Sequence, residues 1–168
     1  MKYCHECGTA LIDKELEHEG IVPYCPNCQD YRFPMYNVAV SMIIINEENQ
    51  KILLVKQYGK DYFRLVAGYV NRTETLEHAA VRELKEETGY SAGRVKYLGC
   101  INPSVAYSEE VIHLYLMTGL VPGLQSLDDD EALEVELIPF DEVYRMAAEG
   151  ELTDAKTIAG IFMAKHQR

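Results

Sequence analysis

The sequence predicts an α/β fold in which helices cover both faces of a mixed sheet, an α/β/α sandwich, preceded by a small cysteine-rich module. Three observations support this prediction. Apolar, strand-like segments are interspersed with helical segments over most of the chain. Four of the five cysteines lie close to the N-terminus. The chain has 168 residues, 48% of them hydrophobic, which is enough for one main domain with a small appendage. We therefore assign the cysteine-rich module to residues 1–33 and the main domain to residues 34–168.

The overall composition excludes several classes of protein. No run approaches the roughly 18 apolar residues of a membrane span, and residues 1–10 lack the apolar stretch of a signal peptide. We expect a cytoplasmic protein with no membrane partner. The formal net charge of −11 argues against a surface for long nucleic acids. A small anionic substrate is still compatible with this charge if metal ions and local cations receive it, and we expect a homodimer.

The first predicted element is a metal-binding module at residues 1–33. It contains two C-x-x-C pairs, Cys4 with Cys7 and Cys25 with Cys28, whose spacing is typical of a zinc ribbon. Two disulfides are the alternative, but no secretion signal supports them. Structural Zn²⁺ is therefore preferred, because the module has too few large apolar residues to fold without a metal. The module could serve as a structural element, a protein contact, a dimer element or a cover for the active site.

Three strands are predicted before the first helix. Residues 31–46 begin at a proline-containing joint and continue as an apolar run typical of a buried strand. A polar turn follows, and residues 51–58 return as the second strand of a hairpin. Residues 62–70 form the third strand, which leads directly into the segment that carries the chemistry.

A helix is predicted at residues 75–89, at the centre of the domain. Thr75 is suited to cap its N-terminus and Gly89 to end it. One face of this helix carries three carboxylates, those of Glu83, Glu86 and Glu87. Clustered carboxylates tend to stay ionised only when a cation lies among them, and their hard oxygens suit Mg²⁺ or Mn²⁺. The alternative for an isolated run of this kind is a solvated acidic face with ordinary surface ion pairs.

After this helix, the order is strand, loop, strand, acidic loop, strand and two helices. The predicted strands are residues 94–101, 111–120 and 133–140, and the predicted helices are residues 140–150 and 154–166. Cys100 lies in an apolar context, so we expect a buried structural thiol there and not a nucleophile.

The segment at residues 68–90 resembles the Nudix box. The pattern of that box is a glycine, five residues, a glutamate, seven residues, and then R-E-hydrophobic-x-E-E-x-G-hydrophobic. Its fixed positions are met by Gly68, Glu74, Arg82, Glu83, Leu84, Glu86, Glu87 and Gly89. Tyr90 stands where an aliphatic residue is usual. The resemblance implies the Nudix fold and a metal-dependent hydrolase that cleaves the diphosphate of a small nucleotide derivative.

Residue roles follow from the same resemblance. Glu83 and Glu87 are expected to be the principal ligands of the catalytic Mg²⁺ or Mn²⁺. Glu86 is expected to be a bridging or water-mediated ligand, and the carbonyl of Ala67 a backbone ligand.

Supporting residues are expected around this metal site. Arg82 should orient the carboxylates, and Glu74 should anchor the loop to the helix. The catalytic base comes from the box or from the acidic loop and the strand after it, where the candidates are Glu131 and Glu134. Substrate phosphates and ribose need donors, and the candidates near the box are Lys56, Arg64 and Arg72.

Two groups within the Nudix family resemble different parts of the chain. The zinc ribbon and the AGYV that enters the box resemble NADH pyrophosphatases, although INPSVAYSE stands in place of their SQPWPFPxS signature. We also do not expect the extra N-terminal domain that precedes the ribbon in many of these enzymes. The segments PSVAYSEEVIHLYL, DEALEVELIPFDEV, GELTDAKTIAGI and ILLVKQY resemble ADP-ribose pyrophosphatases. We therefore expect ADP-ribose or a related ADP-sugar as substrate, with NAD(H) as the alternative. Pro103 and Tyr107 are expected to shape the substrate pocket.

Functions of two other classes are the alternatives. The chain could be a non-catalytic module that senses a nucleotide, but the intact Glu83, Glu86 and Glu87 argue against this. It could remove damaged nucleoside triphosphates or act on capped RNA ends. The acidic net charge disfavours long RNA but not a short capped end.

Overall fold

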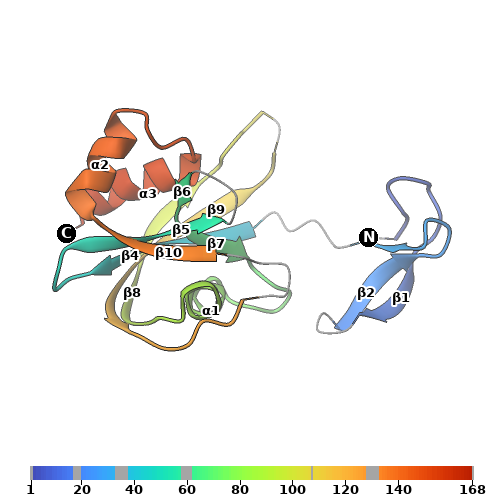
Figure 1. The fold of residues 1–168 in the computed structure, drawn as a ribbon. Helices are drawn as coiled ribbons and strands as arrows, with labels where there is room; N and C mark the ends of the chain where they lie inside the picture. The colour runs from blue at the N-terminus through green and yellow to red at the C-terminus, as the bar shows by residue number, and fades with distance from the viewer. Residues whose placement is uncertain are drawn as a thin grey trace. The chain divides into compact units, whose positions relative to one another are not determined.

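The computed structural model describes residues 2–16, 20–32, 38–57, 62–106, 108–127 and 133–167. The chain forms two compact units, Met1–Met35 and Tyr36–Arg168 (Figure 1). The domain boundary predicted after residue 33 lies outside the described residues and stays a prediction.

The small unit is a three-stranded antiparallel sheet. Its strands are β1 (Ile12–Leu16), β2 (Gly20–Cys25) and β3 (Asp30–Tyr31). Among its described residues, the buried hydrophobic side chains are those of Cys4, Val22 and Cys25. An apolar core this small cannot offset the conformational entropy that ordering the unit costs.

The large unit is built on a seven-stranded mixed sheet. The strand order is β10-β5-β4-β9-β8, with β6 paired to β5 and β7 paired to β4. The strands are β4 (Val38–Asn46), β5 (Lys51–Gln57), β6 (Phe63–Arg64), β7 (Val66–Tyr69), β8 (Ser91–Ile101), β9 (Val111–Val121) and β10 (Leu133–Pro139). β4 and β9 run parallel and the other pairs are antiparallel, so the sheet is mixed, as predicted.

Helices cover both faces of this sheet. Figure 1 shows α1 (Leu76–Thr88) on one face and α2 (Phe140–Ala148) with α3 (Ala155–Lys165) on the other. Two apolar cores result. The core under α1 includes Met42, Leu53, Val66, Leu84 and Met117, and the core under α2 and α3 includes Ile43, Leu54, Leu114, Phe140 and Ile161. The predicted α/β/α sandwich is confirmed. Within the described part of the chain, no helix is long and apolar enough to cross a membrane.

The strand predicted at residues 62–70 is interrupted at Leu65. The N–H of Leu65 donates to the hydroxyl of Thr157 in α3 at 2.9 Å, and both residues are buried. The carboxylate of Asp154 caps α3 by accepting from the N–H of Thr157 at 3.0 Å. Because the N–H of Leu65 bonds a helix instead of a strand, the ladder divides into β6 and β7. This bond ties α3 to the segment that leads into α1.

Cys100 is exposed, so the prediction of a buried thiol was wrong. Its strand, β8, is the last in the strand order of the sheet. An edge strand has a neighbour on one side only, and the apolar sequence around Cys100 does not reveal that position.

Candidate active site

The helix that carries the predicted metal ligands begins and ends as expected. Thr75 is the N-cap, and its side chain accepts from the N–H of His78 at 3.2 Å. Gly89 ends the helix with a positive φ of 74°, and its N–H donates to the carbonyl of Lys85 at 2.9 Å. A residue with a side chain would be strained at this φ, so glycine defines the helix end.

The carboxylate of Glu83 lies directly against the backbone of Gly68. A Cβ atom built on Gly68 would lie 1.9 Å from both Cδ and Oε1 of Glu83. Any side chain at this position would therefore overlap the carboxylate. Gly68 belongs to β7, so the missing side chain allows a helix carboxylate to reach a strand backbone. Ala67, whose carbonyl is the predicted backbone ligand, directly precedes Gly68 in the same strand.

Arg82 connects the strand, the loop and the helix. Its Nε and Nη2 donate to the two carboxylate oxygens of Glu74 at 2.9 and 3.0 Å, and Nη2 also donates to the carbonyl of Tyr69 at 3.0 Å. Its Nη1 donates to Glu83 at 2.8 Å and to Glu86 at 3.0 Å. The hydrogen bond from Arg82 lowers the pKa of Glu74, and the bond to Glu74 raises the pKa of Arg82. These bonds join the loop to the helix and contact two of the three carboxylates, and the supporting roles of Arg82 and Glu74 in catalysis stay predictions.

The three carboxylates of α1 differ in exposure. The side chain of Glu86 is 45% exposed and that of Glu83 is 14% exposed. Glu87 is only 3% exposed. A carboxylate is this buried only where charged or hydrogen-bonding groups offset its desolvation. The site therefore offers several hard oxygen donors near one backbone peptide, and this donor set fits a divalent cation of the Mg²⁺ or Mn²⁺ type.

The predicted phosphate donors divide between the two faces of the sheet. Arg64 pairs with Val55, which belongs to the core under α1, whereas Lys56 pairs with Phe63, which packs against the core under α2 and α3. Paired residues point to the same face and successive residues to opposite faces. Arg64 therefore shares the face of α1, while Lys56 lies on the other face. Glu134 pairs with Lys56 and faces away from α1 as well.

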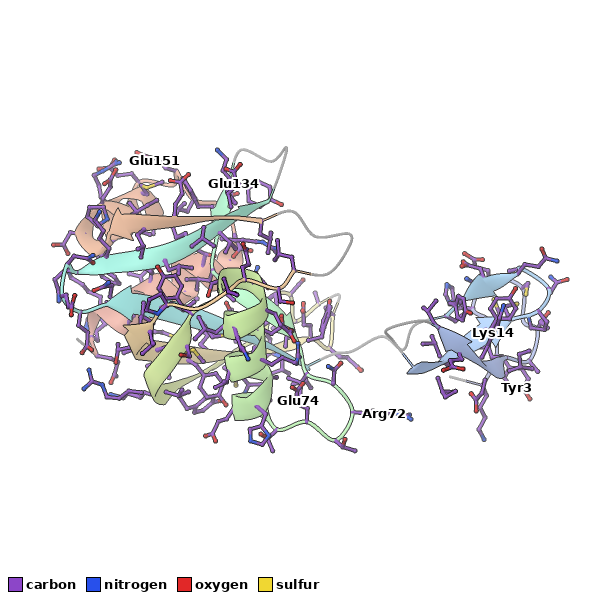
Figure 2. The ribbon with its side chains drawn as sticks, turned by 60° about the horizontal axis from the view of Figure 1, so that its bottom comes forward. Tyr3, Lys14, Arg72, Glu74, Glu134 and Glu151 are labelled. Atoms are coloured by element: carbon purple, nitrogen blue, oxygen red, sulfur yellow. The ribbon has the colours of Figure 1, made fainter. Side chains whose placement is uncertain are left out.

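Other predicted residues lie in loops. Arg72 and Pro103 are exposed. Figure 2 shows Arg72 and Glu74 in the loop before α1, well separated from Glu134 on β10. Tyr107 and Glu131 lie outside the described residues, so their roles stay predictions.

Two loops open at the same end of the sheet. Tyr69, at the end of β7, pairs with Ala39, which pairs with Ile112, which in turn pairs with Ile101. Strands are about 4.8 Å apart, so the loop before α1 and the loop at residues 102–110 start about 14 Å from each other. One extended ligand could therefore contact both loops.

Two residues that the sequence analysis missed hold the end of α1. The side chain of Gln125 and the backbone of Ser126 donate to carbonyls of the last turn of α1. Their contacts join segments about 40 residues apart. No local pattern marks such a pairing.

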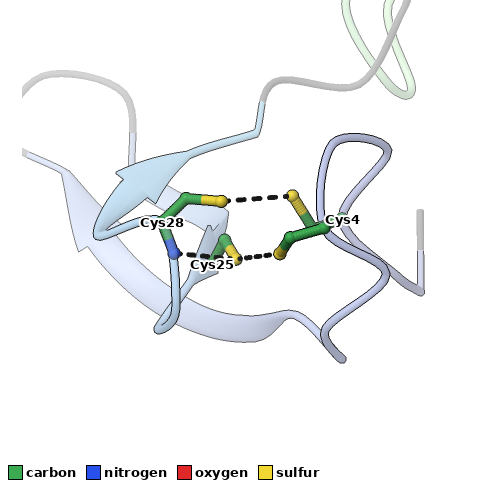
Figure 3. A group of neighbouring side chains, drawn as sticks. Cys4, Cys25 and Cys28 are labelled. Atoms are coloured by element: carbon green, nitrogen blue, oxygen red, sulfur yellow. Dashed lines mark hydrogen bonds between the residues drawn. The ribbon is translucent and has the colours of Figure 1, made fainter.

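The four N-terminal cysteines form a second candidate site (Figure 3). Their sulfur atoms all lie within 4.8 Å of one another, with 3.9 Å between Cys4 and Cys28 and 3.5 Å between Cys7 and Cys25. A disulfide bond measures about 2.05 Å, so these are free thiols. Four sulfurs held tetrahedrally at about 2.3 Å from one ion are about 3.8 Å apart. The cluster therefore fits a tetrahedral metal site.

A buried arginine borders this cluster. Arg32 is 5% exposed, and its Nε donates to Sγ of Cys4 at 3.2 Å. Its guanidinium also pairs with Asp30 and Glu6, each at 2.5 Å. Burial raises the pKa of Cys4, but the hydrogen bond from Arg32 and backbone hydrogen bonds outweigh it, and the pKa is lowered. The thiolate, which is the metal-binding form, is thus favoured.

Comparisons with known proteins agree with this geometry. Residues 35–161 match the family described as NUDIX domain. An ADP-ribose pyrophosphatase from Bacillus subtilis is 32% identical over 129 residues, which are 73% of this chain and 69% of that protein. An NAD-capped RNA hydrolase NudC from Pseudomonas aeruginosa is 25% identical over 142 residues, which are 82% of this chain, and the chain spans 49% of that protein. A solved structure titled as an ADP compounds hydrolase shares the fold, with a TM-score of 0.70 at 20% identity over 94% of this chain and 83% of that chain.

The contact between Gly68 and Glu83 yields a prediction. Gly68→Ala should displace the Glu83 carboxylate, since the new Cβ would lie 1.9 Å from it. Misplacement of a catalytic group by about 1 Å costs about 100-fold in rate, so metal-dependent hydrolysis should fall by about this factor. Steady-state kinetics measure the loss, with circular dichroism to confirm folding. Gly93→Ala is the matched control, because its Cβ would approach Gly119 no closer than 3.3 Å. Equal rates for Gly68→Ala and the control would show that the position of Glu83 does not matter.

Proposed function

Because this chain belongs to the Nudix hydrolase family, we propose that it is a metal-dependent pyrophosphohydrolase that cleaves ADP-ribose, or a related ADP-sugar, to AMP and a sugar phosphate. The observation that carries the proposal is the Glu83 carboxylate against the backbone of Gly68, on a helix whose Glu87 is buried. The similarity to the Bacillus subtilis ADP-ribose pyrophosphatase, over 69% of that protein, supports the choice of substrate.

The proposed metal ligands are Glu83, Glu86, Glu87 and the carbonyl of Ala67. Their oxygens favour Mg²⁺ or Mn²⁺ over softer metals. Divalent cations held there would neutralise the charge of the diphosphate and lower the pKa of an attacking water. Arg82 donates to Glu83 and to Glu86, and we propose that these bonds orient both carboxylates for metal binding.

Phosphate binding and proton removal from the attacking water are assigned to residues outside α1. Arg64 is the favoured phosphate donor, because it shares the face of α1 and its buried Nε has no hydrogen-bond acceptor among the described residues. A buried donor of this kind is satisfied when a ligand supplies an acceptor. Glu131 is favoured over Glu134 as the base that takes the proton of the attacking water, since Glu134 pairs with Lys56 on the opposite face.

The loop at residues 102–110 is proposed to select the substrate. It starts about 14 Å from the end of β7, a distance that an adenine-containing diphosphate can cover. Pro103 is exposed in this loop, and Tyr107 is kept as a candidate contact. Lys56 is a weaker candidate, because it faces away from α1. Arg72 stays a candidate in the loop before α1, where its side chain is exposed.

NAD(H), free or as an RNA cap, is the second candidate substrate. The cysteine cluster and the similarity to an NAD-capped RNA hydrolase NudC favour it. We rank it second because the chain spans only 49% of that relative. A nucleotide-sensing module without activity is the third hypothesis, and the three carboxylates on one face of α1 argue against it. The expected homodimer stays a prediction.

We also propose that the cysteine cluster binds one structural Zn²⁺. Four thiolates at tetrahedral spacing are the preferred ligands of this ion. The net charge of zinc with four thiolates is negative, and the buried Arg32 would offset part of it.

The first prediction concerns the metal-binding carboxylates. Glu87→Gln removes one charge without changing shape, and kcat should fall by about 10³, equivalent to about 4 kcal/mol of barrier. Glu77→Gln, an exposed change in the first turn of the same helix, should leave kcat near that of the wild type. Turnover of Glu87→Gln close to that of Glu77→Gln would remove Glu87 from the ligand set.

The second prediction concerns zinc. Elemental analysis of protein purified without chelator should find one Zn²⁺ per chain. Cys25→Ser should lose the metal, whereas Cys100→Ser, a change at an exposed cysteine in the other unit, should retain it. Metal-free wild-type protein, or two disulfides found by mass spectrometry, would contradict the assignment.

The third prediction tests the substrate. Hydrolysis of ADP-ribose should exceed that of NADH in kcat/KM by about 10- to 200-fold, the range that a few pocket contacts provide. Side-by-side assays of AMP, ribose 5-phosphate and reduced mononucleotide release decide the order. A preference for NADH would reverse our ranking of the two substrates, and no hydrolysis of either would reject both.

A further inference from the structure

The last turn of α1 is held by a segment that follows β9, about 40 residues further along the chain. The last four carbonyls of a helix have no partner inside it. The N–H of Ser126 donates to the carbonyl of Glu86 at 3.1 Å, and Nε2 of Gln125 donates to the carbonyl of Glu87 at 2.6 Å. We call residues 122–127, which follow β9, the α1 clasp.

The clasp fits the helix end only because two glycines meet there. A Cβ on Gly89 would lie 2.6 Å from the backbone N of Gln125, and a Cβ on Gly123 would lie 2.6 Å from the carbonyl oxygen of Gly89. Real Cβ atoms do not approach other atoms this closely. Gly89 therefore does more than end the helix, because its missing side chain also admits the clasp.

The clasp acts where the charge of α1 is least favourable. The C-terminus of a helix carries a partial negative charge, which opposes carboxylates in the last turn. Glu86 and Glu87 lie in that turn. The two N–H donors of the clasp bind the carbonyls that carry this partial charge. They offset part of the repulsion, and they fix the backbone from which both carboxylates project.

We propose that Gln125 is a positioning residue for the metal site, an inference that rests on the proposed role of Glu86 and Glu87 as metal ligands. Its side-chain N–H holds the carbonyl of Glu87 and so keeps the last turn helical. Without this donor the helix end frays, and the cation itself must order the two carboxylates. Metal affinity therefore falls, while turnover recovers once the site is saturated with metal.

The test is Gln125→Met, which keeps the length of the side chain and removes its donor. The Kd for Mn²⁺, measured by electron paramagnetic resonance of the free ion in the absence of substrate, should rise about fivefold, the factor that corresponds to one neutral hydrogen bond of about 1 kcal/mol. kcat at saturating Mn²⁺ should stay within about twofold of the wild type, as a positioning role requires. Leu124→Met is the matched control, because this neighbouring side chain is 90% exposed.

A second variant tests the same contact through the backbone. Gly123→Ala should raise the Kd for Mn²⁺ in the same direction, because its Cβ would push the clasp away from Gly89. If this variant does not fold, the Kd of Gln125→Met for Mn²⁺ is the deciding measurement. A lower Tm of Gln125→Met with an unchanged Kd for Mn²⁺ would overturn the inference, since the residue would then be merely structural. Absence of Mn²⁺ binding by the wild type would overturn the proposed function together with this inference.

Discussion

The close contact between the Glu83 carboxylate and the backbone of Gly68 is the constraint on which the candidate site depends. It brings α1 so near to β7 that the carboxylate of Glu83 lies against the backbone of the strand. Arg82 then bonds the end of that strand, the loop after it and the helix, at Tyr69, Glu74 and Glu86 respectively. Hydrogen bonds therefore join strand, loop and helix, and a shift of any one would move the oxygens that are proposed to bind metal.

Electrostatic repulsion explains why both Arg82 and the α1 clasp donate hydrogen bonds to α1. Several carboxylates at one helix end repel one another and the helix dipole. Arg82 offsets this repulsion from the side of the loop, and the α1 clasp offsets it from the side of β9. The remaining negative charge agrees with a site that attracts divalent cations. The same cations would allow a protein of net charge −11 to receive an anionic diphosphate.

The small unit depends less on apolar burial than the large unit does. Among its described residues few hydrophobic side chains are buried, and its four thiols lie within 4.8 Å of one another instead. Arg32 adds a buried positive charge next to Cys4. Metal binding would thus contribute folding free energy that an apolar core supplies elsewhere. The small unit would therefore have a source of stability separate from the two apolar cores of the Nudix domain.

The sequence by itself determined the family, the sandwich, the bounds of α1 and the cysteine cluster, because each depends on short-range spacing: helical periodicity with caps at Thr75 and Gly89, and two C-x-x-C pairs. Only the tertiary structure decided which face each strand residue takes, and so it separated Arg64 from Lys56 and Glu134. It also divided one predicted strand at Leu65, exposed Cys100 on an edge strand and brought Gln125 to the end of α1. These outcomes depend on contacts between residues far apart in the chain, which local propensity and periodicity do not encode.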